Sequence, residues 1–260
     1  MKIWITGASS GMGEACAYLY ASRGESLVLT SPTEEELAPV AKNCLEKGAA
    51  AVKILPYDLQ NSEGINSLAD MAWDAFDGLD ILFCNAGISH RTTVEDTSME
   101  LFRKVMEIDF FAPAAIAKHI LPKMIGRGGG HIAATSSIAG KFGFPLRCAY
   151  SSAKHAVYGF FETLQAENHD KGIKVTVVCP GRVRTNISLN SLVDVNKAYG
   201  KMDPGQAGGL EVTKAAERIV KAIDKGKREV LVGRKELLMV YIKRFFPGLC
   251  AVMSRKLKPV

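Results

Sequence analysis

A tyrosine and a lysine near the middle of the chain, Tyr150 and Lys154, have the spacing that proton transfer needs. Residues four apart lie one turn apart on a helix, so the phenol and the ammonium group project from the same face. A positive charge beside a phenol favours the phenolate, so we expect Lys154 to lower the pKa of Tyr150 toward neutrality. Such a tyrosine could exchange a proton with a substrate oxygen. The alternative is a half-buried tyrosine beside a solvated lysine.

A glycine-rich turn near the start of the chain supplies a second element. A β-rich run at 3–6 is followed by Gly7, Gly11 and Gly13, and then by a helical pattern at 14–21. This order is typical of a dinucleotide-binding loop, in which the first glycine permits the turn, the second admits the pyrophosphate and the third lets the helix pack closely. The helix N-terminus would face the anion. An ordinary glycine turn is the alternative.

Five motifs in the same order resemble those of the short-chain dehydrogenase/reductase family, in its short form. They are the glycine loop at 6–13, the Cys-Asn-Ala-Gly turn at 84–87, Ser137 thirteen residues before Tyr150, the Tyr-x-x-x-Lys pair, and Pro-Gly-x-Val-x-Thr at 180–185. Each motif is weak alone, but the ordered set is specific. It covers the chain from residue 3 to about residue 190.

The resemblance implies an oxidoreductase that interconverts a carbonyl and a secondary alcohol by hydride transfer with a nicotinamide cofactor. It implies that Tyr150 is the general acid and base, that Ser137 holds the substrate oxygen, and that Lys154 also binds the nicotinamide ribose. Ser136 competes with Ser137, and only the spacing to Tyr150 favours Ser137. The implied cofactor-binding residues are Gly7, Ser9, Ser10, Gly11, Met12, Gly13, Ser31, Asp58, Leu59, Asn85, Ala86, Gly87, Tyr150, Lys154, Pro180, Gly181, Val183 and Thr185.

Asp109 is the main departure from the family pattern. The family usually has an asparagine at this place, and the backbone carbonyl of that residue helps to order a water chain to the lysine. Asp109 keeps the carbonyl, so we carry it over as a catalytic relay residue. Its carboxylate could also pair with Lys154 and change the local charge. Asp109 is the one feature that favours the alternative function, a dinucleotide-binding sensor or scaffold whose catalysis has lapsed.

The end of the second expected strand bears on the choice of cofactor. NAD-binding sites of this fold usually carry an acidic residue there, which accepts a hydrogen bond from the ribose 2′-hydroxyl. This strand ends in Ser31 and Pro32, so no carboxylate would repel a 2′-phosphate. We therefore expect NADP(H) to be favoured modestly over NAD(H), with the glutamates at 34–36 facing solvent. The hydroxyl groups available to a phosphate belong to Ser9, Ser10, Ser31 and Thr33.

Length and patterning predict the fold. A chain of 260 residues with 47% hydrophobic residues can bury one sizeable core, so we expect a single catalytic domain over 1–260. Strand and helix patterns alternate, which predicts an α/β, doubly wound parallel sheet (Rossmann fold) with helices on both faces. A helix over 99–125 contains Pro113 and should be kinked there. The seven expected strands lie at 3–6, 26–31, 51–57, 81–85, 131–136, 174–179 and 229–232.

Several features that the sequence lacks bear on where we expect the protein to be found. No apolar run reaches the roughly 18 residues that span a bilayer, and a strand that begins at residue 3 leaves no room for a leader. The six cysteines are scattered without metal-ligand spacing, which predicts reduced thiols and no metal. We expect a cytoplasmic protein. The resemblance implies a homodimer or homotetramer through helices at 99–125 and 151–169, with apolar area from Val157, Phe160, Phe161 and Leu164.

The last part of the chain is basic and apolar. Residues 214–260 contain thirteen Lys or Arg against four Asp or Glu, and 236–260 is rich in aliphatic and aromatic residues. Such a tail could lie on an anionic membrane surface. We favour packing on the body, at a subunit interface or over the substrate pocket, because Pro247 and Gly248 break a long amphipathic helix. No nucleic-acid recognition element accompanies the charge. Residues 186–210 resemble the family's substrate loop, which does not identify a ligand.

Overall fold

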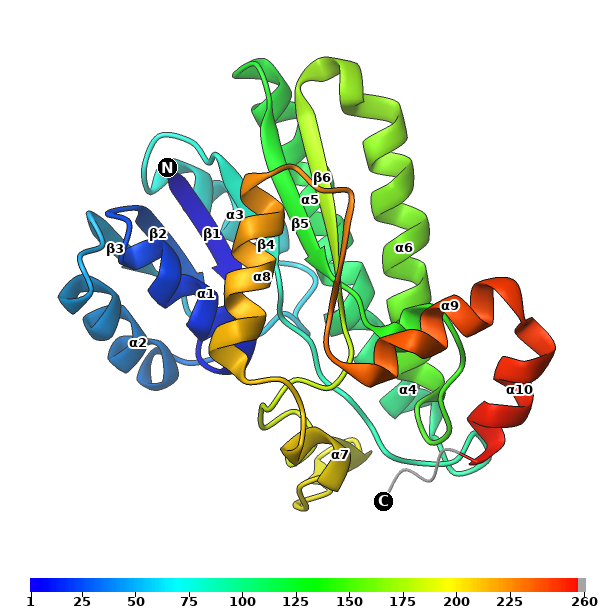
Figure 1. Ribbon diagram of the computed structural model, residues 1–260. Coiled ribbons are helices and arrows are strands. Elements are labelled where there is room, and N and C mark those ends of the chain that lie inside the picture. Colours follow the sequence, from blue (N-terminus) through cyan, green and yellow to red (C-terminus); the bar gives the residue numbers. More distant parts are fainter. Residues whose placement is uncertain (257–260) are drawn as a thin grey trace.

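The computed structural model describes residues 1–256 as a parallel sheet between two layers of helices (Figure 1). The seven strands are in the order β3-β2-β1-β4-β5-β6-β9, and every neighbouring pair is parallel. The predicted doubly wound sheet is therefore confirmed. The strands are β1 Lys2–Thr6, β2 Ser26–Thr30, β3 Ala51–Ile54, β4 Ile81–Cys84, β5 Gly130–Thr135, β6 Ile173–Pro180 and β9 Glu229–Val232.

Helices cover both faces of this sheet. Helices α1, α2 and α8 share one core cluster, whereas α3, α5 and α6 share the other, and α4 packs on α6. The short pair β7–β8 and helix α7 lie in the expected substrate loop at 186–210. The bounds are α1 Gly11–Ala21, α2 Glu34–Glu46, α3 Ile65–Asp74, α4 Met99–Met106, α5 Ala112–Gly126, α6 Cys148–Asn168, β7 Leu192–Asp194, β8 Lys197–Ala198, α7 Pro204–Ala207 and α8 Val212–Asp224.

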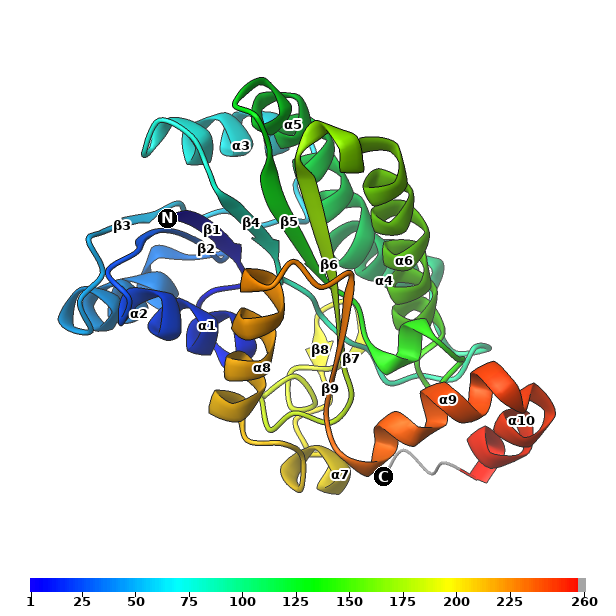
Figure 2. The ribbon, with the colours of Figure 1, turned by 45° about the horizontal axis from the view of Figure 1, so that its top comes forward.

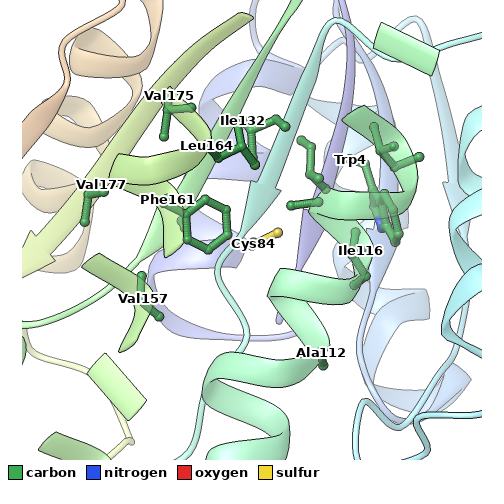
Figure 3. Close-up of a cluster of buried hydrophobic side chains, with 14 of the residues drawn as sticks. Trp4, Cys84, Ala112, Ile116, Ile132, Val157, Phe161, Leu164, Val175 and Val177 are labelled. Carbon is green, nitrogen blue, oxygen red and sulfur yellow. The ribbon is translucent and has the colours of Figure 1, made fainter. Parts of the chain in front are cut away.

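Strand β1 shows why the strands read as continuous apolar runs. Trp4 points into the cluster drawn in Figure 3, while Ile3 and Ile5 belong to the cluster on the opposite face. Because both faces are buried, the middle of such a strand is a continuous apolar run. Figure 3 also shows Val157 and Phe161 inside the core.

Three of the four residues that we expected to supply apolar area to a subunit interface are buried within the single chain. Val157, Phe161 and Leu164 are buried in the core of the single chain, so our expectation that they supply interface area is wrong. Their buried side chains face the sheet. Phe160 remains half-buried and packs edge-on against Phe110, with ring centroids 6.3 Å apart.

The sheet changes winding direction between β1 and β4. These neighbouring strands are paired in parallel, and the chain leaves them toward opposite sides of the sheet. In open α/β sheets, ligands bind at the carboxyl ends of the strands at this switch point. The glycine loop follows β1 and the Cys84–Gly87 turn follows β4, so both predicted motifs meet there.

Two local features follow from the sequence. Thr33 caps α2, because its Oγ1 accepts a hydrogen bond from the Glu36 N–H at 3.3 Å. The helix expected over 99–125 is interrupted by one turn of π-helix, Glu107–Phe111, just before Pro113. The Ala112 N–H bonds to the Glu107 carbonyl five residues back. Pro113 has no N–H with which to continue the ladder, so the irregularity lies where proline predicts it.

Two helices end the described chain, α9 Leu238–Phe245 and α10 Pro247–Lys256 (Figure 2). We call residues 238–256 the C-terminal arm; the last four residues of the predicted tail lie outside the described residues. Met239 and Cys250 are buried in the core, so packing on the body is confirmed for these two residues. Within residues 1–256, no helix has the length and apolar character needed to cross a membrane. The arm's exposed large apolar side chains are Leu238, Tyr241, Phe245, Phe246, Leu249, Val252 and Met253.

Candidate active site

Two adjoining cavities lie at the carboxyl ends of the strands. Every predicted site residue except Gly13 and Asp109 lines one of them or both. The first, the glycine-loop cleft, is lined by Gly7, Ser9, Ser10, Gly11, Ser31, Asp58, Leu59 and Ala86. The second, the tyrosine pocket, is lined by Ser137, Tyr150, Lys154, Pro180, Gly181 and Val183. Both cavities are lined by Met12, Asn85, Gly87 and Thr185.

The glycine loop needs glycine for reasons that the backbone makes explicit. Gly7 and Gly11 have φ of 62° and 59°, in the left-handed region that side chains disfavour. A Cβ on Gly7 would lie 2.6 Å from the Cα of Ala86, and a Cβ on Gly13 would lie 2.2 Å from the carbonyl oxygen of Gly7. Gly13 lines neither cavity, so its role is the close approach of α1 to the loop.

Asn85 ties the turn after β4 to this loop. Its Nδ2 donates to the carbonyl oxygens of Thr6 and Gly7, each at 3.2 Å. The Thr6 hydroxyl accepts in return from the backbone N–H groups of Asn85 and Ala86. The two predicted motifs are therefore one hydrogen-bonded unit.

The cleft has the features of a dinucleotide-binding site. Helix α1 begins at Gly11, and its N-cap Ser10 forms no side-chain cap hydrogen bond. The first-turn N–H groups of this helix therefore lack a side-chain acceptor at the edge of the cleft, where a pyrophosphate could accept from them. The ordinary-turn alternative does not explain why two close backbone approaches, at Gly7 and Gly13, occur here.

Glu36 corrects part of the cofactor argument. Its Oε2 accepts a hydrogen bond from the Ser31 hydroxyl at 3.0 Å, and Ser31 Oγ is also 2.7 Å from Ser9 Oγ. Glu36 is exposed, as expected for all three glutamates, but its carboxylate also lines the glycine-loop cleft, which the sequence did not predict. Helix α2 begins a short distance after β2, and its first turn carries the Glu36 carboxylate back to the end of that strand.

Tyr150 and Lys154 project into the tyrosine pocket from the first turns of α6. Lys154 Nζ lies 5.6 Å from the centre of the Tyr150 ring. Lys154 is only 2% exposed, donates to the Thr135 carbonyl at 3.0 Å, and lies 3.1 Å from Asp109 Oδ2. The alternative of a solvated lysine is therefore excluded by its burial and by both contacts.

The pKa of Tyr150 departs from its ordinary value in the direction opposite to our expectation. Burial of the phenol raises its pKa most strongly, and the Asp109 carboxylate adds to the rise. Lys154, a hydrogen bond from Ser137, and Arg147 lower it, but they do not outweigh burial. Lys154 lowers the pKa of Tyr150 as expected, but the Asp109 carboxylate beside Lys154 raises it and so weakens this effect.

Asp109 reaches Lys154 from the π-helical turn between α4 and α5. Its Oδ1 accepts from the Ile88 N–H at 2.7 Å, and its Oδ2 faces Lys154. Burial raises the pKa of Asp109, while Lys154 and the Ile88 N–H oppose the rise. Asp109 is therefore the salt-bridge partner of Lys154, as the sequence allowed.

The structure separates the two competing serines. Ser136 Oγ donates to the backbone carbonyl of Lys154 at 2.7 Å and is buried, so it joins β5 to α6. Ser137 Oγ accepts from the Ala139 N–H and lies 3.4 Å from the Pro180 carbonyl. The weaker donor contact leaves Ser137 better able to bind a substrate oxygen, as its spacing to Tyr150 suggested.

Sequence reasoning missed several residues of the pocket wall. Arg147 lies three residues before Tyr150, and that helical spacing was a usable signal. Thr135 was not predicted, although its carbonyl holds Lys154. Phe142, Phe144 and Met239 come from loops and from the C-terminal arm, and no local motif marks them.

Comparisons with known proteins agree with this geometry. The family described as short chain dehydrogenase matches residues 1–194. The chain belongs to the short-chain dehydrogenase/reductase family. It is 37% identical to dehydrogenase/reductase SDR family member 7B of Mus musculus, covering 94% of this chain and 77% of that protein. It is 37% identical to the Drosophila melanogaster dehydrogenase/reductase SDR family protein 7-like, over 93% of this chain and 75% of that one.

Solved structures show the same fold. A short chain dehydrogenase/reductase from Burkholderia phymatum in complex with NAD has a TM-score of 0.83 and 26% identity, covering 99% of this chain and 95% of its own. An alcohol dehydrogenase from Thermococcus sibiricus complexed with 5-hydroxy-NADP has a TM-score of 0.78 over 90% and 96% of the two chains; at 23% identity it shows the fold alone. The chain is thus a dehydrogenase/reductase, and a nicotinamide dinucleotide cofactor is supported.

Proposed function

We propose that this protein interconverts a carbonyl and a secondary alcohol, with Tyr150 as the general acid and base. The observation that carries the proposal is one continuous site: Tyr150, Ser137 and Lys154 line a pocket that joins the glycine-loop cleft through shared residues. When bound, the nicotinamide supplies or accepts the hydride. The cleft is where the chain's backbone can hold the dinucleotide, and the pocket is where its side chains can serve the reacting oxygen.

Each side chain has a separate task in this proposal. Ser137 donates a hydrogen bond to the substrate oxygen and holds it beside the phenol. Tyr150 gives its proton to that oxygen in reduction and takes it back in oxidation. Lys154 favours the phenolate through its charge and carries N–H donors for the ribose. Asp109 holds Lys154 in place at 3.1 Å and offsets part of that charge.

We also propose that the site accepts both NAD(H) and NADP(H), and that Glu36 sets the ratio. The preference for NADP(H) expected from the sequence stays a prediction. The absence of a carboxylate at Ser31 supports NADP(H), whereas the Glu36 carboxylate 3.0 Å from Ser31 Oγ opposes a 2′-phosphate. Among the residues that line the cleft, none is a lysine or an arginine that could attract the phosphate.

The test is Tyr150→Phe, which keeps the ring and deletes the proton. We expect kcat with a ketone panel to fall by about 10²- to 10⁴-fold, with cofactor affinity nearly intact. The matched control is Tyr241→Phe, at an exposed position outside both cavities. A Tyr150→Phe protein that reduces its best substrate at the wild-type rate would contradict the assignment. Wild-type protein that binds NADH but reduces no ketone or quinone would support the sensor or scaffold alternative.

A further inference from the structure

Arg147 occupies a costly position beside the proposed general acid. It is the N-cap residue of α6 and lines the tyrosine pocket. A cation at a helix N-terminus is opposed by the helix dipole. The preceding residue, Leu146, has φ of 59°, a conformation that disfavours side chains other than glycine. A position with two such costs needs a compensating role.

The polar contacts of Arg147 within the protein do not neutralise its charge. Its Nη1 donates to the backbone carbonyls of His90 and Leu146. Within residues 1–256, no carboxylate lies within ion-pair distance of its guanidinium. Burial lowers the pKa of Arg147 to about 10, so the group remains a cation at neutral pH.

The carboxylates around the pocket are already engaged. Asp109 pairs with Lys154. The Asp203 carboxylate lies 3.5 Å from Arg91 and accepts from the backbone N–H groups of Gly205 and Gln206. Glu236 accepts from the backbone N–H groups of Arg182 and Arg234.

Two cations of the pocket have no carboxylate partner among residues 1–256: Arg147, which is half-buried, and Arg182, which is exposed. His90 adds no charge, because burial and Arg147 lower its pKa to about 4.

We propose that Arg147 binds the carboxylate of the substrate, and that the substrate is an apolar oxo acid or the corresponding hydroxy acid. This rests on the proposed carbonyl–alcohol function. A half-buried cation without a carboxylate partner among residues 1–256 matches a monoanion, and a guanidinium presents paired N–H donors to a carboxylate. The rest of the wall matches a hydrocarbon chain, because it is built from Ile138, Phe142, Phe144, Val183, Ile187 and Met239.

The experiment compares acids with their own methyl esters. Straight-chain nine-carbon acids with the keto group at C4, C5 or C6 are each assayed beside the ester. We expect kcat/KM for at least one wild-type acid to exceed that of its ester by about tenfold or more. Arg147→Gln should bring that ratio to about 1 and Arg147→Lys should keep part of it. Arg103→Gln removes the same charge at an exposed position and should leave the ratio unchanged.

The outcomes separate this inference from the proposed function. A wild-type preference for esters, or an equal loss for acid and ester in Arg147→Gln, would overturn it and assign Arg147 to bracing the His90 carbonyl. Wild-type selectivity and Arg147→Lys keep the inference testable where Arg147→Gln does not fold. Reduction of neutral ketones that depends on Tyr150, without any preference for acids, would leave the proposed function standing while this inference fails.

A second observation concerns the C-terminal arm. Thirteen large hydrophobic side chains are exposed among residues 1–256, and seven of them lie in the arm. The 19 residues of the arm include four basic residues and no acidic one. Met239 and Cys250 fix the arm to the core, and α9 and α10 extend beyond α6 at the side of the molecule in both views (Figures 1 and 2).

Charge decides between the possible occupants of this surface. A second copy docked arm against arm about a two-fold axis would bring basic residues together without a carboxylate of the arm to pair them. An anionic bilayer provides both an apolar layer and negative headgroups. We infer that the arm is a docking surface for an anionic membrane, the alternative that the sequence left open but did not favour. Met239 also lines the tyrosine pocket, so docking would bring that pocket close to the bilayer.

Vesicle sedimentation of the full chain tests this surface. We expect binding to vesicles that contain phosphatidylglycerol, much weaker binding to phosphatidylcholine alone, and loss at high salt. Phe245→Ser/Phe246→Ser and Lys243→Glu/Arg244→Glu should each reduce binding at least fivefold, whereas Val94→Ser, an exposed apolar residue elsewhere, should not. Wild-type protein that stays in the supernatant with anionic vesicles would overturn the inference. Light scattering that shows a dimer broken by Phe245→Ser/Phe246→Ser would assign the surface to a second copy instead.

Discussion

The glycine-loop cleft and the tyrosine pocket are built by different means. The cleft is shaped mainly by backbone: positive φ at Gly7 and Gly11, a close contact at Gly13, and the hydrogen bonds of Asn85. The pocket is shaped by side chains from segments far apart in the chain, from Phe142 to Met239. A backbone-built site tolerates few residue types, whereas a side-chain-built site can change its ligand without changing its frame.

The largest effect should come from breaking the backbone-built half. In Gly13→Ala, the new Cβ would lie 2.2 Å from the Gly7 carbonyl oxygen, so the loop must shift. Overpacking of this kind costs about 1–3 kcal/mol, which predicts dinucleotide affinity about 10- to 100-fold weaker. Fluorescence titration with NADH and NADPH measures this.

The control is Gly159→Ala on α6, where a Cβ meets nothing within 4 Å and helix propensity favours alanine by about 1 kcal/mol. It should bind cofactor normally and unfold at an equal or higher temperature. Unchanged cofactor affinity in Gly13→Ala would show that the cleft is less rigid than its contacts indicate.

An intermediate effect should come from the charge of Asp109, which acts on Lys154 and Tyr150. Asp109 raises the pKa of Tyr150, so Asp109→Asn should lower it. Oxidation needs the phenolate, and its acid limb in a pH profile of kcat/KM should therefore move to lower pH, by about one pH unit. Reduction needs the phenol and should begin to fail at a correspondingly lower pH. Steady-state kinetics in both directions across about pH 7–12 follows both limbs, because the pKa of Tyr150 lies above the ordinary value of about 10 for a tyrosine.

Thermal unfolding of Asp109→Asn belongs beside that profile, because the substitution leaves the buried Lys154 without its carboxylate. A folded variant whose two limbs coincide with those of wild type would mean that Asp109 positions Lys154 without tuning Tyr150.

The smallest effect should come from the rim of the cleft. Glu36→Gln removes the carboxylate that Ser31 contacts, and an exposed charge contributes about 0.2–1 kcal/mol. The ratio of kcat/KM for NADPH over NADH should rise about two- to fivefold. Glu35→Gln removes the same charge one residue away, outside the cleft lining. An equal rise in both variants would assign the effect to the general field of the helix.

The two halves also differ in how far the sequence predicts them. The cleft was predictable because the backbone geometry of short segments determines which residue types fit at Gly7, Gly11, Gly13 and Asn85. The strands followed for the same reason, since burial on both faces demands continuous apolar runs. Tertiary placement was less accessible. The sequence did not show that Glu36 would turn toward Ser31, because the first turn of a helix presents side chains in several directions.

The wall of the pocket was the least predictable part. Met239 reaches it from an arm whose sequence indicates only an apolar, basic segment. The pKa of Tyr150 was misjudged because the spacing to Lys154 is local, whereas burial and the approach of Asp109 depend on how α6 packs against the turn after α4. Long-range packing, not local pattern, sets the electrostatics of this site.

The π-helical turn at Glu107–Phe111 has a consequence for how this site could be lost or gained. A π turn holds one residue more than an α turn. Deleting a single residue there would remove the extra residue of this turn, so the side chains within the turn would point in different directions. The carboxylate of Asp109 would then swing off the axis that points to Lys154. A one-codon change in length, with no change at any active-site residue, could therefore disconnect the charge pair behind Tyr150.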